Sequence, residues 1–143
     1  MTDPGHSIWI SNRQRVVVDE DDLVDLAAEV LSGEGVTDVE LSVSLVDDDE
    51  MECLHVRYMN EPGPTDVLSF AQDEEKGRPG LLLGDVVIDP AEATRNSPSD
   101  PASEVRLLLV HGILHLLGYD HEVETDRTSM WERQERYSGV AAG

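Results

Sequence analysis

Several short stretches of the chain are rich in apolar residues, and one of them alternates apolar with polar residues, as a strand with one buried face does. The clearest stretch runs from Val39 to Leu45, where every second residue is apolar. Shorter apolar runs lie on either side of a polar turn at 11–15. The pattern predicts strands at 8–10, 16–18, 39–45, 65–70 and 81–88, the last interrupted at Gly84-Asp85 and ended by Pro90.

Four other segments repeat apolar residues every three or four positions, which is the period of an amphipathic helix. Acidic residues open the first two, where negative charge interacts favourably with the helix dipole. The pair Asp100-Pro101 starts the third, because aspartate can cap free amide groups and proline suits a first helical turn. The predicted helices span about 19–33, 47–58, 100–117 and 125–137.

The second predicted helix begins with a cluster of four acidic residues, 47–50. Carboxylate clusters also bind calcium, but this one lacks the central glycine and the distal glutamate of a helix-loop-helix calcium loop. We therefore assign the cluster to helix capping and solvation.

The third predicted helix is apolar over too much of its surface for a helix on the outside of a protein, so we expect it to be central. The order of the elements predicts an α+β fold with one small mixed β-sheet of about four strands flanked by helices. A chain of 143 residues fits one domain, residues 1–143, with loose ends at 1–6 and 139–143.

The charge balance is strongly acidic, with 31 Asp and Glu against 10 Lys and Arg, for a net charge of -21. Such a field repels polyanions, whereas nucleic-acid-binding proteins usually present a basic face. RNA binding would therefore need one of two conditions. The arginines could gather on one face, or the protein could work in a cell of high salt content, where the Debye length falls to roughly 3 Å near 1 M salt. An acidic surface can equally reflect the general composition of proteins in one lineage, and in that case it carries no information about binding partners.

The chain has no apolar stretch near the roughly 20 residues that a membrane helix needs, and no charged and then apolar leader. We expect a soluble cytoplasmic protein without a membrane partner. Cys53 is the only cysteine, which excludes an intramolecular disulfide. Its place in an apolar helical pattern predicts a buried thiol, and the neighbouring Glu52 would oppose a nucleophilic thiolate.

Three of the five histidines lie within eleven residues, in the segment HGILHLLGYDH at 111–121. His111 and His115 share a helix face and can place two nitrogens on one ion at about 2.0 to 2.1 Å. Gly118 permits a sharp turn that would bring His121 to the same ion. Three imidazoles suit zinc, copper, nickel or iron, and they leave a coordination position open to water. We predict a catalytic site for one Zn²⁺ ion, with Ni²⁺ among the alternatives.

Two further roles for the histidines fit the pattern less well. A histidine on an apolar helix face is often a hydrogen-bonded core residue, but three at this spacing argue against that role. A structural zinc site usually has four ligands rich in cysteine, and Cys53 is far away in the sequence.

The motif differs from the metalloprotease pattern His-Glu-x-x-His, in which the glutamate is the general base. Gly112 occupies the glutamate position, so a zincin-like geometry here would lack the peptidase's proton acceptor. Water would have to be activated by the ion itself or by a carboxylate such as Asp85, Asp120 or Glu122. Asp120 can also form the turn, or orient an imidazole through its other ring nitrogen.

The histidine segment resembles that of a known family. HGILHLLGYDH is similar to the signature of the YbeY family of bacterial ribosomal RNA maturation factors. The resemblance covers about 39–137 and continues in the same order through PTDVLSF at 64–70, Gly84-Asp85-Val86, Asp100-Pro101 and 130–135.

The resemblance implies a metal-dependent, single-strand-specific endoribonuclease. Such an enzyme would act in ribosomal RNA processing, notably at the 3′ end of the small-subunit RNA, and in ribosome quality control. The resemblance also implies a small mixed sheet flanked by helices. The family's metal ligands map onto His111, His115 and His121.

One position departs from the family pattern. The family commonly shows Leu-Asn-x-x-Tyr-Arg before PTDVLSF, with that arginine tied to RNA handling, whereas this chain has LHVRYM at 54–59. Met59 cannot bind phosphate, and Arg57 would point to a different face of a helix. The candidate substrate contacts are His55, Arg57, Thr65 and Ser69, and the candidate catalytic residues are Arg57, Asp85 and Asp120.

Two alternative functions stay open from the sequence. The first is a ribosome assembly factor, with nuclease activity that is weak or dependent on partners. Proteins of the small ribosomal subunit are basic, so an acidic factor would be steered to them more readily than to naked RNA. The second is metal-dependent hydrolysis of a peptide or another small substrate, which Gly112 disfavours.

Overall fold

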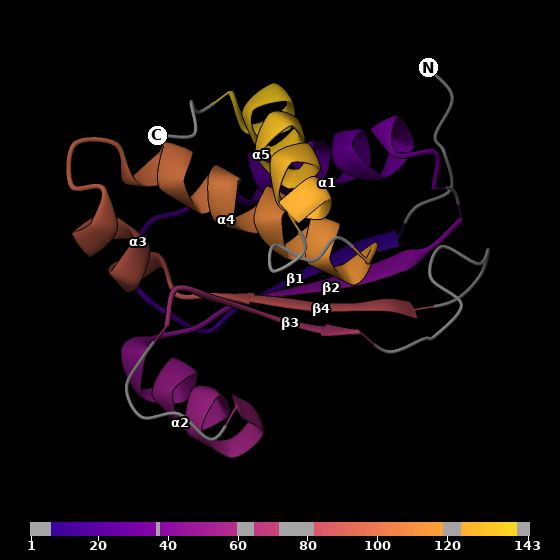
Figure 1. Cartoon of the computed structure of the whole chain (residues 1–143). Helices are drawn as coiled ribbons and strands as arrows, with labels where there is room; N and C mark the ends of the chain where they lie inside the picture. Colours follow the sequence, from indigo (N-terminus) through magenta and orange to yellow (C-terminus); the bar gives the residue numbers. More distant parts are fainter. Residues whose placement is uncertain (1–6, 37, 60–64, 72–81, 119–123, 140–143) are drawn as a thin grey trace.

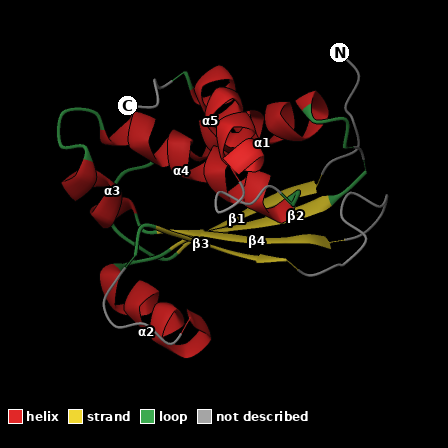
Figure 2. Ribbon diagram, in the orientation of Figure 1, coloured by secondary structure: helices red, strands yellow, loops and turns green. Residues whose placement is uncertain are grey.

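The computed structural model describes residues 7–36, 38–59, 65–71, 82–118 and 124–139, apart from the side chains of residues 59 and 124–128. Its strands and helices confirm the α+β prediction (Figures 1 and 2). In chain order they are β1 (Ser7–Asn12), α1 (Glu20–Gly33), β2 (Glu40–Leu45), α2 (Asp48–Met59), β3 (Val67–Ala71), β4 (Leu82–Ile88), α3 (Pro90–Asn96), α4 (Pro101–Leu116) and α5 (Glu124–Ser138).

The four described strands form one mixed sheet in the order β1-β2-β4-β3. β1, β2 and β4 are parallel, and β3 runs antiparallel to β4 at the edge. The register between β2 and β4 shifts by one residue: Glu40 pairs with Leu82, but the next residue, Leu41, pairs with Gly84. The sequence break predicted at Gly84 is therefore a β-bulge, which bends a strand without ending it.

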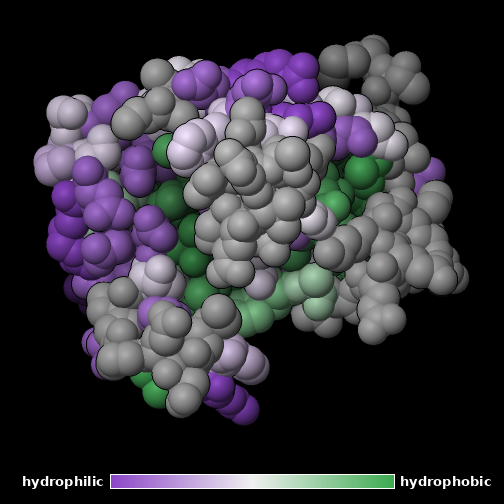
Figure 3. Space-filling view, viewed as in Figure 1, coloured by the Kyte–Doolittle hydropathy of each residue, from purple (hydrophilic) through white to green (hydrophobic). Residues whose placement is uncertain are grey.

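Helices α1, α4 and α5 lie on one side of the sheet and α2 lies on the other (Figure 1). β2 shows the division, because Leu41, Val43 and Leu45 are buried in the larger core while the serines between them are half-buried. α2 covers a smaller cluster made of Val46, Met51, Leu68 and Val87. The face seen in Figure 3 is hydrophilic over the outward sides of the helices, with hydrophobic residues mainly in its middle. None of the described helices combines the length and hydrophobicity that crossing a bilayer requires.

Residues 16–18 were predicted as a strand, and that prediction is wrong. They form a loop before α1 that bends at Val16, and in this loop Val17 is 97% exposed. The side-chain amide of Gln14 takes the place of a neighbouring strand: it donates to the Val16 carbonyl at 2.8 Å and accepts from the Val16 amide at 2.8 Å. The backbone of Val16 therefore finds its hydrogen bonds without joining the sheet.

The prediction of a buried Cys53 is also wrong, because the thiol is exposed on α2. Only one side of α2 packs on the sheet, through Met51 and Leu54. Cys53 stands between these two residues in the sequence, so it points to the opposite side of the helix.

Pro90 ends β4 as expected, but it also begins α3, which the sequence pattern did not reveal. Asp89 is the N-cap of this short helix and accepts from the amides of Ala91 and Glu92 at 3.1 and 3.3 Å. The side chain is fully buried, and its other oxygen finds no hydrogen-bond partner among the described residues. Burial, followed by the neighbouring Asp48 carboxyl, raises the pKa of Asp89 to about 7. A proton on Asp89 would allow it to donate to Asp48.

The raised pKa of Asp89 predicts a pH-dependent stability. Folding raises this pKa from 3.8, so the folded chain holds a proton that the unfolded chain releases between about pH 4 and 7. This contribution to the free energy of unfolding is complete below about pH 4 and is lost as the pH rises through 7. Asp89→Asn keeps the acceptor and supplies a permanent donor, so its stability relative to the wild type should rise between pH 5 and 8 in urea titrations.

Asp100→Asn is the matched control for this titration. Hydrogen bonds from Ser103 lower the pKa of Asp100, so its carboxylate stabilises the fold at higher pH. This variant should therefore lose relative stability as the pH rises from the acid range. A flat difference between Asp89→Asn and the wild type over pH 5 to 8 would contradict the assignment.

Candidate metal centre

α4 is the central helix that the sequence predicted. Asp100 caps it, accepting from the Ser103 amide at 3.2 Å and from the Ser103 hydroxyl at 2.6 Å, and Pro101 fits its first turn. Its buried residues lie on most of its surface: Val105, Leu108, Leu109, Val110, Gly112, Ile113, Leu114 and Leu116. Leu117 forms the C-cap, just before Gly118.

Gly112 brings α4 unusually close to the sheet. A Cβ atom at this position would lie 2.6 Å from Cγ1 of Val86 on β4 and 3.2 Å from Oγ of Ser69 on β3. Ser69 uses this proximity and donates a hydrogen bond from Oγ to the Gly112 carbonyl at 3.1 Å. The residue that occupies the glutamate position of a metalloprotease motif is therefore a packing residue in this chain.

His111 and His115 lie side by side on the half-buried face of α4. Their ring centroids are 4.6 Å apart and the rings are inclined at 65°. The structure thus brings together two of the three predicted ligands with the i, i+4 spacing that two-nitrogen metal sites use. The third, His121, lies outside the described residues, and so do Asp120 and Glu122. Within the described ranges no set of three possible ligand side chains is complete.

Gln134 on α5 fixes the orientation of His111. The amide oxygen Oε1 lies 2.6 Å from Nδ1 of His111, and the Gln134 side chain is buried. A carbonyl oxygen can only accept, so Nδ1 carries a hydrogen, and in the neutral ring Nε2 then holds the lone pair. Hydrogen bonding of one ring nitrogen to a buried acceptor is the usual way in which a protein prepares the other nitrogen for a metal.

α5 is itself anchored to the end of α1. Glu34 accepts from Nε of Arg133 at 2.9 Å and from the hydroxyl of Tyr137 at 2.7 Å. Burial and the hydrogen bond to Glu34 raise the pKa of Tyr137, which keeps its hydroxyl a donor. Met130, Gln134 and Tyr137 form the buried stripe of α5. Gln134 was not among the predicted site residues, and the spacing of this stripe was the available sign that its polar side chain faces inward.

A model of a known family also matches the chain. The family is described as Endoribonuclease YbeY, and the match covers residues 9–140. The chain belongs to the YbeY family. A relative from Thermobifida fusca, named Endoribonuclease YbeY, is 48% identical over 138 residues, which are 90% of this chain and 89% of the relative. One of the same name from Acidothermus cellulolyticus is 46% identical, covering 90% and 87%.

The fold is similar to a solution structure of a Thermotoga maritima protein, with a TM-score of 0.64 at 29% identity. That similarity covers 93% of this chain and 86% of the Thermotoga protein. The YbeY resemblance noted for about 39–137 is confirmed and extends to almost the whole chain.

Several other candidate residues of this YbeY chain lie away from the histidines. Val86 points toward α4, and side chains alternate across a strand, so Asp85 points to the α2 side of the sheet. There it borders a recess together with Phe70 and Tyr58. The structure therefore places the sheet between Asp85 and the histidine pair.

The predicted substrate contacts divide between the two sides of the sheet. His55 and Arg57 belong to α2, where Arg57 is exposed with its guanidinium 5.5 Å from the centre of the Tyr58 ring. Ser69 lies beneath α4 and is bonded to Gly112, and Thr65 is half-buried just before β3. The side chain of Met59, the residue at the family's arginine position, lies outside the described part.

The close approach at Gly112 predicts a specific cost for an added methyl group. Gly112→Ala should lower the free energy of unfolding by about 1 to 3 kcal/mol, because the Cβ overlaps Val86. Chemical denaturation would measure the loss. Adding Val86→Ala as a second substitution provides the space, so the same methyl should cost less in that background. Equal costs in the two backgrounds would show that this contact does not set the helix position.

The hydrogen bond from Gln134 predicts a tautomer effect at His111. Gln134→Leu removes the acceptor, so the single Nδ1–H form should become a mixture, visible in the nitrogen-15 chemical shifts of the ring. Zinc affinity, measured by competition with a chromophoric chelator, should fall by roughly 10- to 100-fold. Gln134→Glu retains an acceptor and is the control for both measurements. Unchanged shifts in the leucine variant would contradict the role of Gln134.

Proposed function

We propose that this chain is a metal-dependent, single-strand-specific endoribonuclease of ribosomal RNA maturation. The proposed reaction is processing at the 3′ end of the small-subunit RNA, with a further part in ribosome quality control, in the cytoplasm. Membership of the YbeY family supports the reaction class. The observation that carries the proposal is the pair His111 and His115, with the Nδ1 nitrogen of one ring held by Gln134.

The proposed metal ligands are His111, His115 and His121, with zinc as the ion. The donor set fits, because neutral imidazoles are good zinc ligands and the Nδ1 hydrogen bond leaves Nε2 of His111 ready to bind. When bound, zinc supplies Lewis acidity toward phosphoryl oxygens and makes hydroxide available near neutral pH. Three protein ligands leave room for water or substrate at the ion.

The chain's own residues would supply position and proton transfer. Gln134 holds the His111 ring, and Ser69 fixes the backbone of α4 between the two histidines at Gly112. Asp120 is the proposed proton acceptor or ring-orienting carboxylate, since it directly precedes His121 in the chain. Asp85 is a weaker choice for this role, because it points to the other side of the sheet.

A partner-dependent assembly factor is the second candidate function, and the charge distribution favours it. The net charge is -21, and four arginines on separate elements are already bound to carboxylates. The pairs are Arg13–Glu50, Arg95–Asp48, Arg106–Asp22 and Arg133–Glu34. These cations do not form a basic face for RNA, so a basic protein of the small ribosomal subunit would help to bring substrate and enzyme together.

His115→Ala tests the proposed reaction. The variant should lose bound metal, measured by elemental analysis, and should lose cleavage of a fluorescent single-stranded RNA. A chelator should have the same effect on the wild type, and added zinc should restore activity only there. His55→Ala is the control for metal content, because it removes an imidazole from α2 on the other side of the sheet. Cleavage at the wild-type rate by metal-free His115→Ala would refute the mechanism.

The same assay separates the two candidate functions. Purified wild-type protein is tested on the single-stranded RNA with and without a small-subunit ribosomal protein. Cleavage by the protein alone supports an autonomous endoribonuclease. Cleavage that appears only with the ribosomal protein supports the assembly factor.

A further inference from the structure

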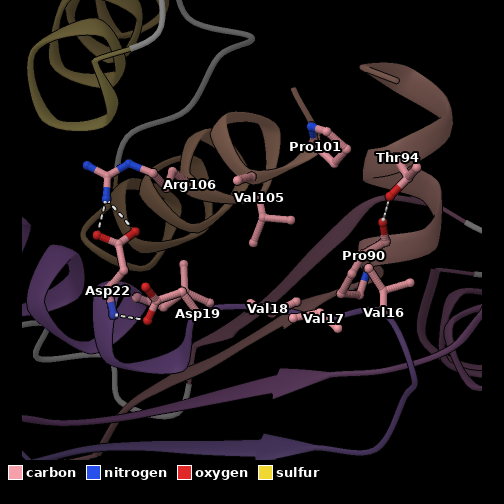
Figure 4. A pocket seen from close by; sticks show the side chains of 12 residues that line it. Val16, Val17, Val18, Asp19, Asp22, Pro90, Thr94, Pro101, Val105 and Arg106 are labelled. Atoms are coloured by element: carbon pink, nitrogen blue, oxygen red, sulfur yellow. Dashed lines mark hydrogen bonds and ion pairs between the residues drawn. The ribbon is translucent and has the colours of Figure 1, made fainter. Parts of the chain in front are cut away.

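An apolar hollow lies at the end of α4 opposite to the histidines (Figure 4). Its walls come from the loop before α1 and from the first residues of α1, α3 and α4. The apolar lining includes Val16, Val18, Leu23, Pro90, Pro101 and Val105. Val105 precedes His111 by six residues and His115 by ten, which is about 9 and 15 Å along a helix axis. The hollow is therefore separate from the candidate metal centre.

The loop beside the hollow displays apolar surface to solvent. Val17 is 97% exposed and Val16 is 36% exposed. Both belong to the loop 16–18, which has strand-forming residues but joins no strand of the described sheet. An exposed apolar segment beside an apolar hollow is typical of a surface that a partner covers.

The rim of the hollow is acidic at Asp19, which lines it and is exposed. Next to lining residues in the chain, exposed carboxylates outnumber exposed cations by three to two: Glu20, Asp21 and Asp100 against Arg15 and Arg95. Hydrogen bonds from Ser103 lower the pKa of Asp100, so this carboxylate stays ionised at neutral pH.

The one basic side chain in the lining does not offset this charge. Arg106 is bound to both carboxylate oxygens of Asp22, at 2.7 and 2.6 Å (Figure 4). The hollow therefore presents an apolar floor within a negative rim.

We propose that this hollow binds an extended, positively charged polypeptide segment of another protein. One apolar side chain of the segment enters the hollow beside Val17 and Val105, and flanking lysines or arginines meet the carboxylates at 19–21 and Asp100. Charge complementarity selects this occupant, because the same carboxylates repel the phosphates of RNA and the headgroups of an acidic membrane. The proposal does not depend on the endoribonuclease activity.

Fluorescence anisotropy with two labelled peptides tests the proposal. The probe is the heptapeptide RKRLRKR, and its partner RKRARKR differs only by alanine in place of the central leucine. The full-length protein should bind the leucine peptide about tenfold more tightly, because only leucine fills the apolar hollow. Backbone amide shifts of 16–18 should move on titration with the leucine peptide. Equal affinities for the two peptides, or no binding of either, would overturn the proposal.

Two variants locate the binding. Ala102 lines the hollow and is exposed, so Ala102→Trp fills the space without removing core contacts and should abolish the tenfold preference for leucine. Val56→Ser is the control, because Val56 is another exposed valine, 46% accessible, on α2 at a distant face. It should leave the preference unchanged.

Two further results would overturn the proposal. The first is a preference for leucine that persists in Ala102→Trp or disappears in Val56→Ser. The second is an oligo-uridylate that competes with the leucine peptide and shifts the amides of 16–18, which would assign the surface to RNA.

Discussion

The position of α4 against the sheet depends on the contact of the Gly112 backbone with Val86 and Ser69. The backbone at Gly112 lies where a methyl group would overlap Val86, and Ser69 holds its carbonyl from below. The helix cannot move inward, and any rotation would break the Ser69 bond and expose buried leucines. His111 and His115 flank this point, so the angle at which they leave the helix follows from the contact. Packing therefore positions the histidine pair on a helix that the strands support.

The sheet separates the candidate site residues into two groups. The histidines, Gln134 and Ser69 share the side covered by α1, α4 and α5, and Asp85 and Arg57 share the side of α2. β3 is the edge strand between the two groups, and the segment PTDVLSF ends there. An RNA strand that contacted both groups would have to pass around this edge. Met59, at the position where the resemblance implied an arginine, comes shortly before β3 in the chain.

The sequence predicted the parts of this chain that local patterns determine. Alternation located β2, and a β-branched apolar run located β4. The capping pair Asp100-Pro101 located α4, and the histidine spacing located the pair at 111 and 115. The failures have causes that the hydrophobic pattern does not show. The run 16–18 has the composition of a strand, but the Gln14 amide satisfies Val16 locally. The side of the sheet on which Asp85 lies depends on the bulge at Gly84. The hydrogen bond between Gln134 and His111 joins residues 23 positions apart in the chain.

The hydrogen bond between Gln134 and His111 also bears on the order in which the chain is made. A ribosome releases the segment that holds all three histidines before it releases residue 134, and Glu34 must already be folded on α1 to receive Arg133 and Tyr137. During synthesis His111 is therefore present before Gln134 can form the hydrogen bond that selects its ring tautomer. The His111 ring acquires its final orientation only when α5 docks, so the geometry of the histidine pair depends on the arrival of that helix.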